Sequence, residues 1–119
     1  MAERRLRILI VEDEMLVAMN IEDMLIDLGH EVAGLASRLD AALALAGEGG
    51  FDAAMLDVNL AGEQSFPVAD LLRARGIPYL FATGYGIQGI AEAHRGAPVL
   101  QKPFRESDLG EALIRLAAV

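Results

Sequence analysis

Residues 51–62 read FDAAMLDVNLAG, and this stretch decides how the chain is expected to fold. Its small and apolar side chains at 53–56 are followed abruptly by Asp57. Such a run is typical of a strand that is buried on both faces of a parallel sheet. Because a carboxylate is costly to bury without a partner, Asp57 either caps a loop where the strand reaches solvent or has partners from elsewhere in the chain.

The composition is that of a single globular domain. The chain has 119 residues, of which 54% are hydrophobic, and it has no cysteine. Disulfides and thiolate metal sites are therefore excluded, and no apolar run reaches the roughly 18 residues that a membrane span needs. The net charge of −8 argues against a nucleic-acid surface and favours cations or cationic protein faces. We expect one cytoplasmic domain over residues 1–119.

Strand and helix patterns alternate five times along the chain. Strands are expected at 6–11, 30–36, 51–57, 77–82 and 97–101. Helices are expected at 15–28, 38–46 and 67–75, in a weak segment at 84–96, and in a last helix that Ser107 can cap. This alternation predicts an α/β fold, a doubly wound (βα)5 flavodoxin-like three-layer sandwich. Its five-stranded parallel sheet would have the strand order 2-1-3-4-5.

Polar residues follow four of these strands, at the point where each strand ends. They are Glu12 and Asp13, Asp57, Thr83, and Lys102. The carboxyl ends of parallel strands meet at one edge of the sheet, where such folds bind their ligands, so we expect these side chains to converge. Thr83 and Lys102 are each the only residue of their type in the chain.

This set of side chains has the chemistry of a phosphoryl-transfer site. Three close carboxylates repel one another, and at least one would keep a proton unless a cation such as Mg²⁺ joined them. The Lys102 ammonium and the Thr83 hydroxyl would hold phosphoryl oxygens. Asp57 would then be the nucleophile that forms an acyl phosphate.

Four motifs give the chain its resemblance to the CheY-like receiver domain of two-component response regulators. They are VEDE at 11–14, LDVN at 56–59, ATG at 82–84 and KPF at 102–104. The resemblance covers the whole chain. It implies that Asp57 takes its phosphoryl group from the phosphohistidine of a sensor histidine kinase.

The resemblance also implies a role for each neighbouring residue. Asp13, Asp57 and the backbone carbonyl of Asn59 would bind Mg²⁺, and Glu12 would assist through water. Thr83 and Lys102 would hold the phosphoryl oxygens. The bond between Lys102 and its following proline is similar to one that is usually cis in the family.

The sequence departs from the usual receiver pattern at the residues that read out phosphorylation. Val99 stands three residues before the lysine, where most receivers have an aromatic switch residue. Residues 81–85, FATGY, resemble a subgroup named FATGUY after this motif, many of whose members are alphaproteobacterial single-domain regulators. We expect Tyr85 either to take over part of the switch, ordering residues 86–95, or to pack on the fifth strand.

The expected function is a signalling switch, not an enzyme acting on other substrates. The chain would transfer a phosphoryl group to itself, remove it again, and act without an output domain. A downstream protein or phosphotransfer partner would bind the face formed by the fourth helix, the fifth strand and the fifth helix. The alternatives are a receiver fragment of a larger regulator or hybrid kinase, and a magnesium-dependent phosphohydrolase. The hydrolase is disfavoured because Val58 and Asn59 follow Asp57, which leaves no second acid.

The remaining residues of chemical interest are given structural interpretations. His30 and His94 are interpreted as surface residues, because neither follows a strand at the expected site. The methionines at positions 15, 19, 24 and 55 are interpreted as fillers in or near the core.

Overall fold

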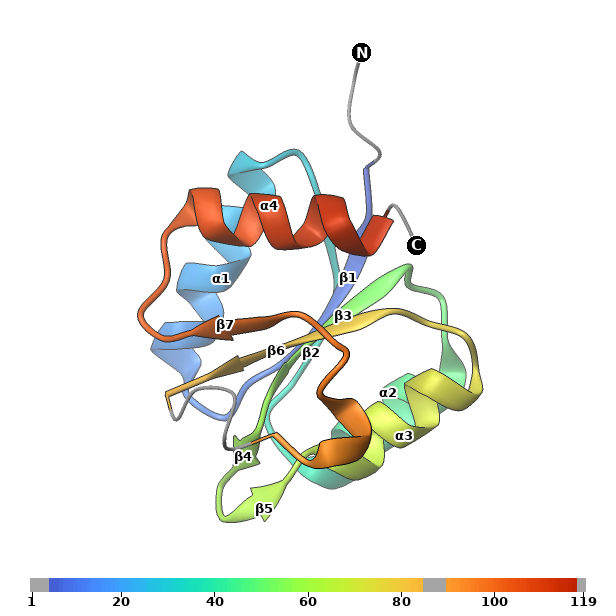
Figure 1. The fold of residues 1–119 in the computed structure, drawn as a ribbon. Helices are drawn as coiled ribbons and strands as arrows, with labels where there is room; N and C mark the ends of the chain where they lie inside the picture. Colours follow the sequence, from blue (N-terminus) through green and yellow to red (C-terminus); the bar gives the residue numbers. More distant parts are fainter. Residues whose placement is uncertain (1–4, 85–89, 118–119) are drawn as a thin grey trace.

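Five parallel strands form the centre of the molecule, as Figure 1 shows. The computed structural model describes residues 5–84 and 90–117, so the proposed Tyr85 switch lies outside the described residues. The strands are β1 (Arg7–Val11), β2 (Glu31–Ala36), β3 (Ala53–Asp57), β6 (Tyr79–Thr83) and β7 (Val99–Gln101). Their order in the sheet is β2-β1-β3-β6-β7. This is the order 2-1-3-4-5 that the sequence predicted.

Helices cover both faces of this sheet and make the expected three layers (Figure 1). One face carries α1 (Met15–Asp27) and α4 (Glu106–Ala117), and the other carries α2 (Leu39–Glu48) and α3 (Phe66–Ala74). None of the helices in the described part of the chain is long and apolar enough to cross a membrane.

Alternation along the central strands divides the core into two clusters. In β3, Leu56 belongs to the cluster on the α2–α3 side, while Met55 belongs to the cluster on the α1–α4 side. In β1, Leu9 and Ile10 divide in the same way. Successive side chains of a strand point to opposite faces, so a strand between two helical layers must be apolar throughout. This is why residues 53–56 carry no polar side chain.

Two loop segments differ from the sequence-based expectations. The loop after Asp57 contains a small hairpin of β4 (Asn59–Leu60) and β5 (Glu63–Gln64). Its turn places Ala61 at φ +50° and Gly62 at φ +91°, the left-handed conformation that tight hairpins need. Residues 84–96 were expected to form a short or frayed helix, and their described part contains one 3₁₀ turn, η2 (Glu92–His94).

The start of the last helix also differs. The helix begins at Glu106, so Ser107 lies inside the first turn and is not the cap. The backbone N–H of Arg105 instead donates to the Asp108 carboxylate at 3.0 Å. The Asp108 carboxylate thus accepts from a backbone N–H that has no acceptor within the helix.

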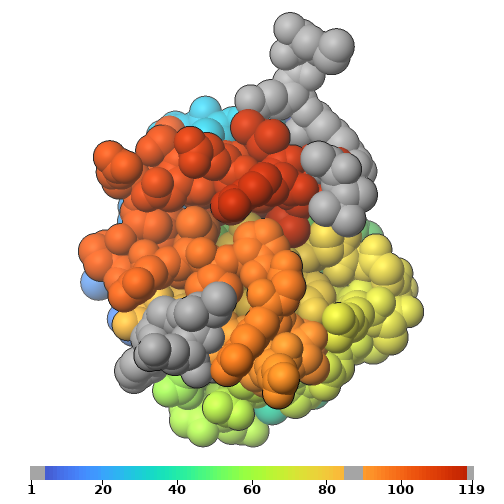
Figure 2. Space-filling model, in the orientation of Figure 1, coloured from blue at the N-terminus to red at the C-terminus, as the bar shows by residue number. Residues whose placement is uncertain are grey.

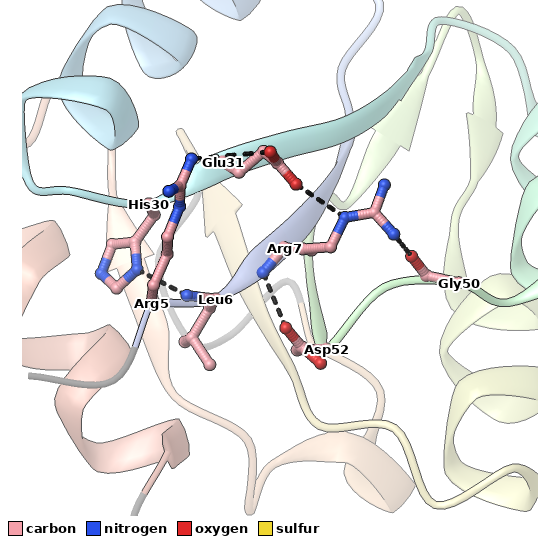
Figure 3. Close-up of polar contacts among 7 residues, drawn as sticks. All are labelled: Arg5, Leu6, Arg7, His30, Glu31, Gly50 and Asp52. Atoms are coloured by element: carbon pink, nitrogen blue, oxygen red, sulfur yellow. Dashed lines mark hydrogen bonds and ion pairs between the residues drawn. The ribbon is translucent and has the colours of Figure 1, made fainter.

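Both histidines are buried, which corrects their interpretation as surface residues. His30 precedes β2, at the sheet edge opposite the polar strand ends, and its Nδ1 accepts a hydrogen bond from the Leu6 N–H at 3.1 Å. Figure 3 shows the polar network around it, in which Arg7 binds Glu31, Gly50 and Asp52. His30 was misassigned because its partner is a backbone group 24 residues away.

Two of the methionines are not core residues. Met55 is buried in the centre of the sheet, but Met15 and Met19 are 58% and 53% exposed on α1. Both were expected in or near the core. Helical spacing allows either face, and the structure turns these two side chains to solvent.

We predict that His30→Ala lowers the free energy of unfolding by about 1–2 kcal/mol, because the buried Leu6 N–H loses its acceptor. His30→Asn is the matched control, since its amide oxygen can still accept near the position of Nδ1. Urea unfolding followed by circular dichroism measures both. Equal losses in the two variants would contradict a role for this hydrogen bond.

Candidate functional site

The structure brings the polar strand ends together at one edge of the sheet. Asp57 is the last residue of β3, and Thr83 is the last residue of β6. Lys102 directly follows β7, and its N–H donates to the Thr83 carbonyl at 2.8 Å. On the other side, the Glu12 N–H donates to the carbonyl of Ala36 at 2.9 Å. The backbone of the sheet therefore sets the spacing of the site.

Three carboxylates form the acidic part of the site. Oxygen atoms of Glu12, Asp13 and Asp57 all lie within 4.8 Å of one another. Glu12 is buried, while Asp13 and Asp57 are half-buried. Carboxylate oxygens at this spacing are suitable ligands for a hard divalent cation. The cluster could hold such an ion.

A single ammonium faces these carboxylates. The Lys102 Nζ donates to Glu12 Oε1 at 2.5 Å and lies 3.4 Å from Asp57 Oδ2. Burial alone would lower the pKa of Lys102, but its hydrogen bond to Glu12 and the charge of Asp57 outweigh burial and raise the pKa above its usual value. Lys102 is therefore charged and positioned between the two carboxylates.

The two aspartates respond differently to this environment. Burial raises the pKa of Asp57 to about 7, and the neighbouring charge of Glu12 adds to the shift, although Lys102 opposes it. For Asp13, burial is outweighed by hydrogen bonds, chiefly from the Ala61 N–H at 3.0 Å, and the pKa falls below its usual value. Burial and the negative charge of Glu12 together outweigh Lys102 and favour a proton on Asp57 near neutral pH, and the set still carries more negative charge than Lys102 can balance. This surplus is what a divalent cation would neutralise, so these residues fit a metal ion.

Thr83 and Val99 lie on β6 and β7, the strands on one side of the three carboxylates. Thr83 is buried at the end of β6. Val99 pairs in register with Phe81 of β6 and packs against the cluster on the α2–α3 side. A valine here fills the core and offers no hydrogen-bonding group.

The hairpin after Asp57 makes a contact that sequence reasoning missed. The Ala61 N–H donates to Asp13 Oδ2, so the turn positions a candidate metal ligand that lies 48 residues earlier. Asn59 Oδ1 accepts from the Gly62 N–H at 3.1 Å within the same turn. From the sequence, residues 58–66 were expected only as a loop, although Asn59 and Gly62 are residue types that turns favour.

A family model for the response regulator receiver domain matches residues 8–114. The chain belongs to this family. It therefore belongs to two-component signalling proteins, and its motif at 81–85 fits the subgroup that the sequence indicated. Receivers are signalling domains and not enzymes in the ordinary sense.

The relatives are regulators of this kind. The phyllosphere-induced regulator PhyR of Methylorubrum extorquens is 33% identical over 116 residues, which are 94% of this chain and 43% of PhyR. The transcriptional regulatory protein PdtaR of Mycobacterium tuberculosis is 32% identical over 90% of this chain and 54% of PdtaR. This receiver thus spans about half the length of the curated relatives it matches.

Solved structures of SdrG resemble this receiver over nearly the whole of both chains. The solution structure of SdrG from Sphingomonas melonis is 46% identical and covers 98% of this chain and 99% of SdrG, with a TM-score of 0.86. The BeF3-activated conformation of SdrG from Pseudomonas melonis covers 92% of this chain and 95% of SdrG, with a TM-score of 0.79.

We predict that the stability of the metal-free protein falls as the pH rises from 4 to 7. The pKa of Asp57 is raised from 3.8 to about 7 by folding, so over this interval the native state holds a proton that the unfolded state has lost. Asp57→Asn removes this effect. At pH 8 the free energy of unfolding of the variant should be higher than that of wild type by on the order of 1 kcal/mol or more. At pH 4 the two values should differ little.

Urea unfolding at both pH values, with and without Mg²⁺, measures this difference. Mg²⁺ should raise the free energy of unfolding of wild type at pH 8, and should raise that of Asp57→Asn less. A difference between the two proteins that does not change with pH would contradict the assignment of the raised pKa to Asp57.

Proposed function

We propose that this receiver accepts a phosphoryl group on Asp57 from the phosphohistidine of a sensor histidine kinase, in a magnesium-dependent reaction, and thereby switches its protein contacts. The observation that carries the proposal is the position of Asp57. Its carboxylate lies 3.4 Å from the only ammonium of the site and within 4.8 Å of two further carboxylates. A nucleophile, a cation site and a phosphate-binding ammonium are thus within reach of one another.

In the transfer step, an oxygen of Asp57 attacks the phosphorus and the phosphorus–nitrogen bond to the kinase histidine breaks. Lys102 exchanges part of its contact with Glu12 for a phosphoryl oxygen, and the Thr83 hydroxyl donates to another. Asp13, Asp57 and the Asn59 backbone carbonyl would hold Mg²⁺, with Glu12 assisting. The ion supplies positive charge that neutralises the phosphoryl oxygens when bound. Self-phosphorylation and self-dephosphorylation are the only reactions proposed.

The proposal extends to domain organisation and place of action. The near-complete overlap with SdrG supports a receiver that acts without an output domain over residues 1–119. Overlap with less than half of PhyR supports the alternative, a receiver within a larger regulator or hybrid kinase. In either case a sensor kinase as donor would place the receiver in the cytoplasm. The downstream partner would bind the surface formed by residues 90–96, β7 and α4.

We further propose that the kinase docks on α1. The apolar side chains of Met15, Leu16 and Met19 are 58%, 81% and 53% exposed there. A groove of about 480 Å³ runs between α1 and residues 102–104, lined by Leu16 among others and reaching Lys102. An apolar surface that ends at a phosphate-binding ammonium suits a helical partner that presents a phosphohistidine.

The first test is phosphorylation by acetyl phosphate with Mg²⁺, followed by intact mass. We expect one labile phosphoryl adduct on wild type and none on Asp57→Asn. Lys102→Ala should form the adduct about 100-fold more slowly, because it loses a donor to the transferred group. Omission of Mg²⁺ should abolish the adduct. Turnover of phosphate esters without an adduct would instead favour the phosphohydrolase.

The second test concerns the docking surface. We expect Leu16→Glu to slow phosphotransfer from the cognate kinase, found by profiling the kinases of the source organism, by about tenfold or more. Phosphorylation by acetyl phosphate should not change. Ile114→Glu is the matched control, because Ile114 is 50% exposed on α4. Equal slowing by both variants, or slowing with acetyl phosphate, would refute docking on α1.

A further inference from the structure

His94 is buried in a hydrogen-bonded cluster that the proposed reaction does not use. Its Nδ1 lies 2.7 Å from the Tyr79 hydroxyl, and its Nε2 lies 2.7 Å from Asp70 Oδ1. A carboxylate can only accept, so Nε2 donates to Asp70, while the Tyr79 hydroxyl is hydrogen-bonded to Nδ1. Both ring nitrogens of His94 therefore have a side-chain partner within this cluster. We call Asp70, Tyr79 and His94 the clasp.

Aromatic packing reinforces the clasp. The His94 ring stacks on Phe66 with a centroid distance of 5.9 Å and an interplanar angle of 7°. The rings of Tyr79 and Phe81 meet it edge to face, at 5.7 and 6.0 Å. The imidazole thereby joins the segment around η2 to both α3 and β6.

The segment that the clasp holds has little regular structure. Residues 90–98 contain the single turn η2, and the Arg73 guanidinium donates to the Ala93 carbonyl at 2.9 Å. A hollow of about 350 Å³ lies beside the segment, between the end of α3, the start of β6 and α4. Figure 2 shows this segment in orange at the surface, between α4 in red and α3 in yellow-green. The clasp is thus a main attachment of a surface segment that does not pack as a helix.

The same face of β6 connects the clasp to the phosphoryl site. Side chains of a strand alternate between faces, so Tyr79, Phe81 and Thr83 point to the same side of the sheet. Tyr79 belongs to the clasp, Phe81 packs on His94, and Thr83 is the proposed hydrogen-bond donor to a phosphoryl oxygen. A shift of Thr83 toward a phosphoryl group would therefore move the strand on which the clasp is built.

We propose that the clasp is the element that reads out phosphorylation, and that it opens when Asp57 is phosphorylated. This inference rests on the proposed function. Both ring nitrogens of His94 already have partners at 2.7 Å. A movement of β6 would therefore loosen these hydrogen bonds and could not add to them. Opening would release residues 90–98 and thereby change the surface of residues 90–96, β7 and α4 that the downstream partner is proposed to bind. His94, Tyr79 and Asp70 are positioning residues and make no contact with the phosphoryl group.

Two variants test whether the clasp holds the segment. Tyr79→Phe keeps the ring and removes the hydroxyl, and Asp70→Ala removes a carboxylate whose side chain is 68% exposed. We expect backbone amides within 90–97 to exchange with deuterium at least tenfold faster in both variants, with α1 unchanged. Asp23→Ala, which removes an exposed carboxylate of α1, is the control and should leave this exchange unchanged. Unchanged exchange in both clasp variants would refute the proposal.

The wild-type protein tests whether phosphorylation opens the clasp. Nuclear magnetic resonance with Mg²⁺ and beryllofluoride should shift the amides of Asp57, Thr83 and Lys102. In the same sample we expect the His94 Nε2–H signal to be lost to solvent exchange, and amides within 90–97 to exchange at least tenfold faster. Because this experiment uses the wild-type protein, it tests the proposal even if a clasp variant does not fold.

Two results of this wild-type experiment would also overturn the inference, and they are distinguishable. If the site amides shift while the His94 imidazole and the exchange at 90–97 stay unchanged or become more protected, the clasp is not the readout and the proposed function stands. If the site amides do not shift and acetyl phosphate gives no adduct, the proposed function fails, and this inference fails with it.

Discussion

One ammonium facing three carboxylates is the constraint on which the rest of this structure depends. Glu12, Asp13 and Asp57 bring three negative charges within 4.8 Å of one another, and Lys102 returns one positive charge, which leaves two uncompensated. Burial and the charge of Glu12 raise the pKa of Asp57 to about 7, so without a cation a proton on Asp57 offsets part of this surplus. A divalent cation would relieve it without the proton and would leave Asp57 free to act as the proposed nucleophile. The charge imbalance is therefore a property of the site that favours metal binding.

The apolar sheet is what makes such a costly arrangement possible. Glu12 and Lys102 are 90 residues apart in sequence, yet parallel strands buried on both faces bring their side chains to 2.5 Å. The polar network around Arg7 lies at the opposite edge of the sheet and ties β1 to Glu31 and Asp52 (Figure 3). The burial of apolar side chains in the centre of the sheet thus offsets the cost of gathering charged side chains at the carboxyl ends of its strands.

Sequence patterns predicted the elements and the converging residues because both depend on local rules. The apolar run before Asp57 and the polar residues at the strand ends needed only strand alternation and the geometry of parallel sheets. The histidines did not follow such rules. His94 is buried because Asp70 and Tyr79, 24 and 15 residues away, satisfy its two nitrogens, and no periodicity reports such partners. The conformation of Ala61 in the hairpin is likewise set by the turn, while alanine itself disfavours it.

The proposed readout of phosphorylation depends on a property that Val99 lacks. A switch needs an element with two discrete arrangements, and a packed valine without polar groups offers no directional bond to exchange. The sheet nevertheless places Val99 in register with Phe81, and Phe81 packs on His94, whose two hydrogen bonds are directional and are either made or broken. A buried polar group that loses one partner is costly, so partly opened states of this cluster are unfavourable. This makes the aromatic cluster around His94, and not the position of Val99, the place in the described structure where a small shift of β6 can be converted into a two-state change.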